Sequence, residues 1–510
     1  MGDPGPGPGA AKSGDLGCTA TWQGSLVPGG FPNQAITSLA EFDDGTGPAL
    51  YAGGWFTEVG GQPMSRVARW DGFQWSPLGS GLNSITVSAL VVFDDGTGPA
   101  LYAGGSFTSA GGVPAANIAR WDGTQWSALG AGTNLIVSSL AVFDDGTGPA
   151  LFVAGGFTLA GGLPAARIAR WDGTSWSALG TGLDSYPRAL AVHDDGAGAA
   201  LFVAGDFFAA GGVPASRIAR WDGHAWSAVG AGVDDRAFAI TEFDEGLGAG
   251  PELVVGGLFL EAGGQPAARI ARWDGSDWSA LGDGLDDWVT SLAVHDDGSG
   301  EALYAGGWFT SSGGLATSRV ARWDGAAFGP LGPGVSENVN ALVSLDHGPA
   351  QGLWVGGRFD SSPSGGAYLA HWSCPPTPFP SEVWGCVAKS AALSTVTPQL
   401  EIETTFELAL ANPAVDLGLG FLLLGDLGVD PFGCGTNLPG LGELLLAPFP
   451  TPVLISTVAM LEGAGTFALD VPNHSSLIGQ ELGLQAATLH LEPEGAVFGA
   501  SGAVVATVAP

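Results

Sequence analysis

Acidic residues at regular intervals are the first candidates for chemistry in this 510-residue chain. A short turn segment that begins with Asp recurs about every 50 residues, and most copies read Asp-Asp-Gly. Its first acids are Asp43, Asp94, Asp144, Asp194, Asp244, Asp296 and Asp346. Carboxylate oxygens are ligands that Ca²⁺ prefers, so calcium binding is one hypothesis. We prefer an ordinary hairpin turn that needs no cofactor, because Asp bonds its own backbone and Gly accepts positive φ.

A second set of candidates lies in segments that differ from one copy to the next. These candidate ligand contacts are Asp184, Tyr186, Arg188, Asp234, Asp235, Arg236, Asp286, Asp287, Trp288, Glu337 and Asn338. Variation on a constant scaffold is typical of a binding face, although unconstrained loops vary as well. Trp288 and Tyr186 beside carboxylates suit a carbohydrate or a cationic peptide.

Motifs of common enzymes are absent from the sequence. It has no H-E-x-x-H, no G-x-S-x-G and no phosphate-binding loop with Lys. Among the histidines, His193 and His295 occupy a slot that holds Phe in other copies, so packing explains them. A carboxylate pair for glycoside cleavage stays open, since the separation of two acids is invisible in sequence. We therefore assign no catalytic residue and favour a protein that is not an enzyme.

The elements that position these residues follow from an internal repeat. An apolar run that ends in small residues recurs with a spacing of 50 or 51, at Gly53, Gly104, Gly155, Gly205, Gly256, Gly306 and Gly356. The third copy predicts strands over 137–143, 150–158, 167–171 and 176–179, separated by turn residues. A unit of this length with four short strands is typical of a propeller blade. We predict an all-β chain with a seven-bladed β-propeller of four-stranded antiparallel blades.

Two features of this unit resemble the kelch and galactose-oxidase class of propellers over residues 18–374. One is the apolar-Gly-Gly strand end, and the other is a pair of aromatic residues around a tight turn. The pairs are Trp70 and Trp75, Trp121 and Trp126, Trp171 and Trp176, Trp221 and Trp226, and Trp273 and Trp278. Their spacing is five rather than the six of kelch, and no Tyr and His cluster could hold copper, so the resemblance implies the fold alone. We expect the recurrent R-x-A-R-W arginines to pack the blades.

Closure of the ring is predicted from both ends of the repeat region. The seventh copy ends at Cys374 without a fourth strand, and Trp22 falls where the second Trp of the motif belongs. We therefore expect the N-terminal strand to complete the last blade, with a disulfide between Cys18 and Cys374 as a clasp. Cys386 and Cys434 form the remaining pair, and four paired cysteines indicate an oxidising compartment.

Composition limits the partners. The net charge is −34 with only two lysines, which argues against nucleic acid or an anionic membrane surface. The first residues carry no apolar leader, and the longest apolar segment, 444–455, is interrupted by three prolines, so we expect no membrane insertion. With the cysteines, these features predict an extracellular or cell-surface protein.

The predicted domains are a Gly/Pro-rich segment (1–17), the propeller (18–374), a Pro-rich linker (375–381) and a small β-sandwich (382–510). Residues 431–435 (Pro-Phe-Gly-Cys-Gly) and the final strand over 503–509 resemble a C-terminal sandwich of secreted bacterial repeat proteins. We expect a non-enzymatic binding or structural interaction module with a carbohydrate or protein ligand. The alternatives are a polysaccharide hydrolase or lyase on a propeller scaffold, and a self-assembling subunit of an extracellular fibre or surface layer.

Overall fold

The computed structural model divides into two units, residues 1–376 and 377–510. In the first unit it describes residues 20–23, 30–246, 248, 250–345, 351–363 and 365–373, and in the second unit it describes eight strands. None of the described residues forms a helix with the length and hydropathy needed to cross a membrane.

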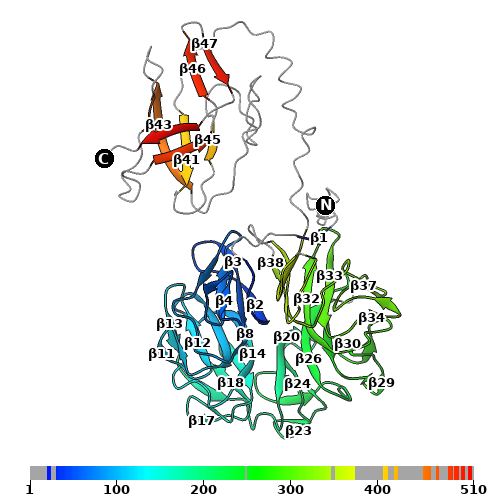
Figure 1. Ribbon diagram of the computed structural model, residues 1–510. Helices are drawn as coiled ribbons and strands as arrows, with labels where there is room; N and C mark the ends of the chain where they lie inside the picture. The colour runs from blue at the N-terminus through cyan, green and yellow to red at the C-terminus, as the bar shows by residue number, and fades with distance from the viewer. Residues whose placement is uncertain are drawn as a thin grey trace, which may run out of the picture. The chain divides into compact units, whose positions relative to one another are not determined.

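The first unit is a seven-bladed β-propeller, which confirms the predicted fold class. Seven four-stranded antiparallel sheets are arranged as blades, and their first strands contact one another in succession around the centre of the ring (Figure 1). These inner strands are β2 (Ile36–Asp43), β8 (Thr86–Asp94), β14 (Val137–Asp144), β20 (Pro187–Asp194), β26 (Ala237–Phe243), β32 (Val289–Asp296) and β38 (Val339–Leu345).

The other strands follow outward in sequence order, except that the outer strand of the seventh blade is β1. The second strands are β3 (Pro48–Gly54), β9 (Pro99–Ser106), β15 (Pro149–Gly155), β21 (Ala199–Gly205), β27 (Glu252–Gly257), β33 (Glu301–Gly307) and β39 (Gly352–Gly357). The third strands are β6 (Val67–Trp70), β12 (Ile118–Trp121), β18 (Ile168–Trp171), β24 (Ile218–Trp221), β30 (Ile270–Trp273), β36 (Val320–Trp323) and β40 (Leu369–Ser373). The outer strands are β7 (Trp75–Pro77), β13 (Trp126–Ala128), β19 (Trp176–Ala178), β25 (Trp226–Ala228), β31 (Trp278–Ala280), β37 (Phe328–Pro330) and β1 (Thr21–Trp22).

One predicted strand was too long. The prediction over 150–158 extends past the observed end of β15 at Gly155, because the chain there turns into a two-stranded hairpin around Gly161 and Gly162, both with positive φ. Among the described residues, six blades carry this hairpin between their second and third strands. The hairpins are β4–β5 (Glu58–Val59, Gln62–Pro63), β10–β11 (Ser109–Ala110, Val113–Pro114), β16–β17 (Leu159–Ala160, Leu163–Pro164), β22–β23 (Ala209–Ala210, Val213–Pro214), β28–β29 (Glu261–Ala262, Gln265–Pro266) and β34–β35 (Ser311–Ser312, Leu315–Ala316).

The Gly-Gly pairs at the ends of the second strands are explained by two close approaches. A Cβ on the second glycine, such as Gly307, would collide with a backbone carbonyl of the preceding loop. A Cβ on the first glycine, such as Gly306, would lie 2.6 Å from the Cγ1 of Val339 in the next blade. Alanine replaces this first glycine at Ala154 and Ala204, where the next inner strand begins with Pro or Ala instead of a β-branched residue.

Ring closure by the N-terminal strand is also confirmed. β1 pairs antiparallel with β40, so that Trp22 lies opposite Trp372 with their ring centroids 5.4 Å apart. The indole nitrogen of Trp22 donates to the Leu331 carbonyl of the neighbouring blade at 2.8 Å. Trp176 makes the equivalent bond to Leu129 at 2.9 Å, so β1 reproduces the contacts of an ordinary outer strand.

The predicted disulfides lie outside the described residues. Cys18, Cys374, Cys386 and Cys434 therefore stay predicted as pairs. Thr21 and Ser373, which are near Cys18 and Cys374 in the chain, are paired in register.

The described part of the second unit is a set of antiparallel strands. Its four-stranded sheet has the order β42 (Leu419–Leu422), β41 (Phe406–Ala411), β43 (Pro452–Met460) and β44 (Phe467–Leu469). Two further pairs join β45 (Glu481–Gln485) to β48 (Ala503–Thr507) and β46 (Thr488–Glu492) to β47 (Gly495–Gly499).

Candidate ligand-binding face

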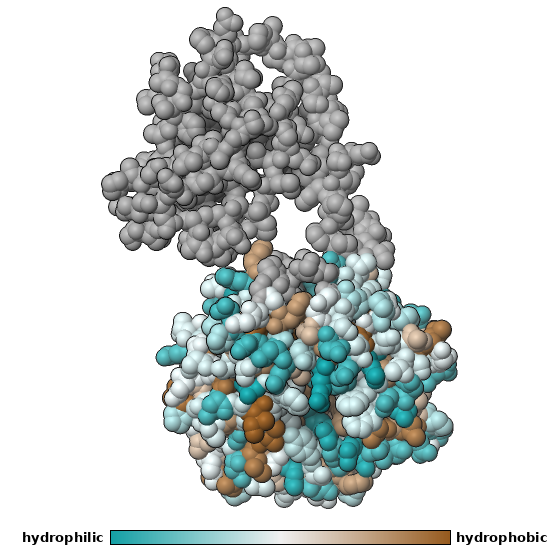
Figure 2. Space-filling view, viewed as in Figure 1, coloured by the Kyte–Doolittle hydropathy of each residue, from teal (hydrophilic) through white to brown (hydrophobic). Residues whose placement is uncertain are grey.

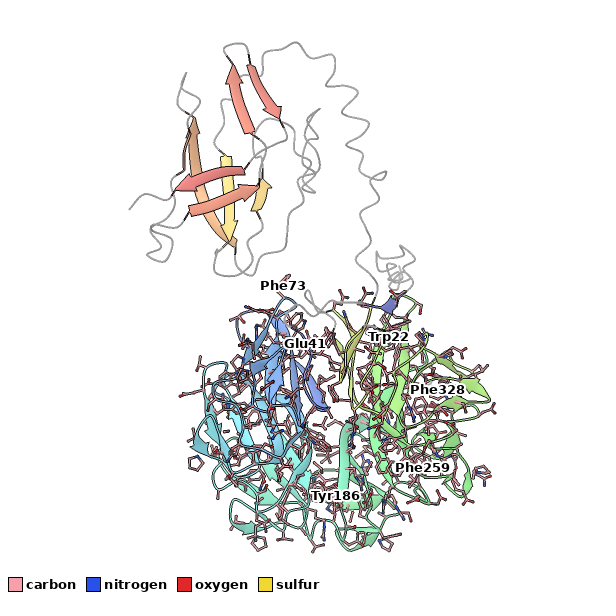
Figure 3. The ribbon with its side chains drawn as sticks, in the orientation of Figure 1. Trp22, Glu41, Phe73, Tyr186, Phe259 and Phe328 are labelled. Atoms are coloured by element: carbon pink, nitrogen blue, oxygen red, sulfur yellow. The ribbon has the colours of Figure 1, made fainter. Side chains whose placement is uncertain are left out.

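The propeller has two faces that differ in chemistry. The turn face carries the turns between the first and second strands and between the third and fourth strands of each blade. The loop face carries the small hairpins and the loops that connect one blade to the next. In Figure 3, Phe73 belongs to a turn on the turn face, and Tyr186 directly precedes β20 on the loop face.

Acids on the turn face satisfy the backbone of their own turns. In Asp43, Oδ1 accepts hydrogen bonds from the amides of Gly45 and Gly47, at 2.8 and 2.9 Å. The same oxygen accepts turn amides in Asp94, Asp144, Asp194, Asp244 and Asp296, while Asp346 lies outside the described residues. Within the described part of the chain, no three His, Cys, Asp or Glu side chains are grouped to hold a metal ion. Calcium binding by these aspartates stays a prediction.

The second acid of each turn pairs with an arginine of the third strand. Asp44 lies 3.3 Å from the Nε of Arg69 and accepts a hydrogen bond from the Tyr51 hydroxyl at 3.0 Å. Burial opposes ionisation of Asp44, but hydrogen bonds from Thr46 and Tyr51 and the charge of Arg69 outweigh it and lower its pKa. Equivalent pairs recur in blades two to six, which places this arginine in blade packing, as predicted from the R-x-A-R-W repeat.

These turns predict sensitivity to acid. Burial would raise the pKa of Asp122, but hydrogen bonds from Gln125 and Thr124 lower it to about 2. A depressed folded-state pKa stabilises the fold above the unfolded value near 3.9, and this contribution is lost as the pH falls toward 2. Because Asp122 is largely solvated, we expect it to contribute about 1 kcal/mol. Urea unfolding at pH 5 and pH 2.5 should show a smaller pH effect in Asp122→Asn than in the unmodified chain; an equal effect would contradict this prediction.

The two histidines in the Phe slot link neighbouring blades. His193 and His295 are buried, at 2% and 6% exposure, as expected for packing residues. His193 Nδ1 lies 2.7 Å from the Oε2 of Glu242 in the next blade, and His295 Nδ1 lies 2.8 Å from the Ser344 hydroxyl. In a neighbouring pair of blades the same two slots hold Phe143 and Val192 in one hydrophobic cluster.

The stability of variants that carry the apolar residues of the repeat at positions 193 and 242 tests this packing explanation. Glu242→Val alone should destabilise the propeller by about 1–2 kcal/mol, because it leaves the buried His193 ring without its partner. His193→Phe combined with Glu242→Val should return the free energy of unfolding to within about 1 kcal/mol of the unmodified chain, since replacing both partners of a hydrogen bond by apolar groups can be nearly neutral. A double-mutant cycle by urea unfolding measures the coupling. A double variant as unstable as the sum of the two single variants would refute the packing explanation.

The loop face holds the exposed apolar side chains of the propeller. Every large hydrophobic residue that is exposed in the described part of the chain lies in an inter-blade loop or in a connection between second and third strands. They are Trp55, Ile85, Val113, Leu135, Leu159, Leu163, Phe208, Val213, Leu260, Trp308 and Leu315. Figure 2 shows hydrophobic patches among polar residues on the visible surface of the propeller. Exposed apolar surface confined to one face is typical of an interaction site.

Three of the predicted contact residues hold loops in place. Asp184 Oδ1 accepts the backbone amides of Phe208 and Ala209, at 2.9 and 3.1 Å. Asp234 and Asp286 accept the equivalent pairs of amides in the next two blades. In three other blades Asn takes the same role, at Asn33, Asn83 and Asn134. Ligand contact by Asp184 or Asp234 would have to use the second oxygen, whereas Oδ2 of Asp286 already accepts the hydroxyls of Thr310 and Ser311.

A β-bulge positions the residues at the centre of the site. Each inner strand shifts register near its start, which leaves one residue unpaired. The residues are Thr37, Ser88, Ser138, Arg188, Phe238, Thr290 and Asn340. Where the side chain is short and polar it ties adjacent blades together, as when Ser138 donates to the Pro187 carbonyl at 2.8 Å. Arg188 and Phe238 depart from this pattern.

Arg188 is held by a carboxylate and two aromatic rings. Its guanidinium makes two hydrogen bonds to Asp206, at 2.6 and 2.8 Å, from Nε and Nη2. Its central carbon lies 4.9 Å from the ring centroid of Phe238 and 5.5 Å from that of Tyr186. Burial raises the pKa of Tyr186, so its hydroxyl stays protonated. Arg236, whose side chain is half-exposed, lies 3.9 Å from the same Asp206 and keeps most of its donors for other partners.

The aromatic side continues across the next blade. The ring centroids of Phe238 and Trp288 are 5.4 Å apart, and those of Trp288 and Trp308 are 5.3 Å apart. We name Tyr186, Arg188, Asp206, Arg236, Phe238, Trp288 and Trp308 the aromatic–arginine cluster. It combines a planar apolar surface that is partly exposed with fixed polar groups, an arrangement suited to bind a ligand and orient it.

The predicted contact residues are only partly brought together. Tyr186, Arg188, Arg236 and Trp288 lie in the cluster, whereas Asp235 and Asp287 accept the amide of the residue that follows each of them. Glu337 is exposed in a later loop, and Asn338 is buried and donates to Asn340. Sequence reasoning missed Asp206, Phe238 and Trp308, although their slots also vary between copies.

Comparison with known proteins adds little to this geometry. No family model matches the sequence, and no curated protein matches it. Among solved structures, the chain is similar to the crystal structure of an ancestral GH74 enzyme, with 13% identity and a TM-score of 0.41. The match covers 69% of this chain and 47% of the other, so the chain spans about half the length of that protein. Function is therefore argued from the site itself.

Proposed function

We propose that the protein is a non-enzymatic binding module, secreted or displayed at a cell surface, that holds a carbohydrate or protein ligand on its loop face. The observation that carries the proposal is the confinement of exposed large apolar side chains to this face, beside the aromatic–arginine cluster. The turn face instead presents carboxylates that already hold their own turns.

The cluster also explains how a binder could be specific. Trp308 is 41% exposed, and Arg236 is half-exposed, whereas Arg188 and Asp206 fix each other's position. Apolar area that leaves water on binding contributes roughly 25 cal/mol per Å², and the prefixed polar groups select the orientation of the ligand.

A binding screen tests this proposal. The full chain is assayed on a glycan array and on immobilised polysaccharides, with the same wells assayed for released sugar. For the ligand that binds best, we expect Trp308→Ala to lose at least about ten-fold in affinity, or about 1.4 kcal/mol. Asp144→Asn on the turn face keeps a carbonyl oxygen for its turn amides and is the matched control, with unchanged affinity. Unchanged affinity in Trp308→Ala would overturn the proposed site, and released sugar would overturn the non-enzymatic assignment.

A further inference from the structure

One slot of the repeat carries a second exposed tryptophan. The residue directly after the Gly-Gly segment lies on the loop face in every blade. From the first blade to the seventh it is Trp55, Ser106, Gly156, Asp206, Leu258, Trp308 and Arg358. Trp308 and Trp55 are therefore two blades apart across the ring closure, with Arg358 of the seventh blade between them. They are 41% and 39% exposed.

Both tryptophans are anchored in the same way. The Trp55 amide donates to the Ala35 carbonyl at 2.9 Å, and the Trp308 amide donates to the Trp288 carbonyl at 2.8 Å. Their own carbonyls accept hydrogen bonds from the Nη1 of Arg66 and of Arg319.

The corresponding arginines of other blades are used differently. Arg167 donates to the Leu183 carbonyl and Arg269 to the Leu285 carbonyl, in the loop that leads to the next blade. A ring whose backbone is fixed on both sides loses little conformational freedom when a ligand stacks on it.

A neighbouring ring packs on Trp308, and a neighbouring charged group lies beside Trp55. Trp308 rests against Trp288, and the guanidinium carbon of Arg358 lies 5.8 Å from the centroid of the Trp55 ring. Arg358 is exposed and presents several N–H donors between the two indoles.

The charge around Trp308, Arg358 and Trp55 favours one class of ligand. The inter-blade loops beside Trp308 carry three acids, Asp286, Asp287 and Glu337, against one exposed arginine, Arg358. An anionic polymer would be repelled, whereas hydroxyl groups can donate to carboxylates and accept from arginine. The C–H face of a pyranose ring matches the negative face of an indole.

We propose that Trp308 and Trp55 are two stacking platforms of one path for a neutral polysaccharide, which crosses the seventh blade beside Arg358. This inference rests on the proposed function and adds the ligand class and the use of a second platform. A chain long enough to reach both platforms gains from effective concentration, which can raise affinity by 10²–10⁴ over a single platform.

Affinity as a function of chain length tests the path. Neutral gluco-, manno- and xylo-oligosaccharides of increasing length are titrated into the full chain by calorimetry. We expect affinity to rise by at least about ten-fold at one length within the series that binds. Trp55→Ala and Trp308→Ala should each abolish this rise and leave long and short sugars equally weak. Asp144→Asn on the turn face, where the residue holds only its own turn amides, should bind as the unmodified chain does.

The possible failures are distinguishable. A length-independent affinity that depends on Trp308 but not on Trp55 overturns the path and leaves the proposed function intact. Absence of binding to every neutral sugar overturns the path, and a basic peptide bound through Trp308 would then identify the occupant as protein. Binding unaffected by either variant overturns both proposals. Thermal melting of each variant serves as the folding control, because each indole is only about 40% exposed and also packs on its neighbours.

Discussion

Removal of residues 1–23 should open the ring and cost the propeller at least about 3 kcal/mol, in the range measured for loss of a large packed side chain. The deletion removes Trp22 from its contact with Trp372 and leaves the Leu331 carbonyl without its donor. It also exposes the edge of β40, which is then free to pair with another chain. We expect a lower urea midpoint and concentration-dependent aggregation.

Complementation separates closure from general damage. A peptide of residues 16–26 added in trans should raise the urea midpoint of the truncated chain, whereas the same peptide with Trp22→Ala should have little effect. A truncated chain that unfolds at the midpoint of the intact chain would contradict the closure. Peptide rescue that does not depend on Trp22 would show that other residues of the segment close the ring.

The second large effect is expected from one methyl group. In Gly307→Ala the new Cβ would collide with the carbonyl oxygen of Trp288, which also accepts the amide of Trp308. Because the backbone must move, we expect Gly307→Ala to lower the free energy of unfolding by about 3 kcal/mol. This corresponds to a fall in Tm of roughly 4 °C for a propeller of this size. The same shift should displace the indoles of Trp288 and Trp308 and weaken ligand binding.

Gly329→Ala is the matched control in the same blade. A Cβ at Gly329 meets only the Arg322 carbonyl oxygen, at 4.0 Å, so its stability and ligand affinity should stay close to those of the unmodified chain. Equal Tm values for the Gly307 and Gly329 variants in differential scanning calorimetry would show that the Trp288 carbonyl can move aside with little loss of stability. The packing explanation for the second glycine would then be wrong.

The periodic features of the fold could be predicted from sequence because each is repeated. The Gly-Gly spacing predicts seven blades, and the position of Trp22 in the motif predicts the closing strand. The β16–β17 hairpin was missed, because two residues on either side of Gly161 and Gly162 are too short to show an alternating pattern.

The site could be predicted only in part, because it depends on contacts between blades. Arg358 lies over Trp55 although 303 residues separate them in the chain, and no local pattern reveals such a pair. Position 206 departs from the repeat, but its role depends on the bulge that places Arg188 beside it. The alternation of Asp184 with Asn134 in one slot was a readable sign that an oxygen acceptor for backbone amides is required there.

Hydroxyl-radical footprinting of the full chain, alone and saturated with the polysaccharide that binds best, tests most directly whether the loop face is the binding face. Mass spectrometry reports the oxidation of each exposed side chain. The account predicts protection of Trp308 and Trp55, with the turn-face peptide that contains Phe73 unchanged. Protection of the Phe73 peptide with full oxidation of Trp308 would contradict it.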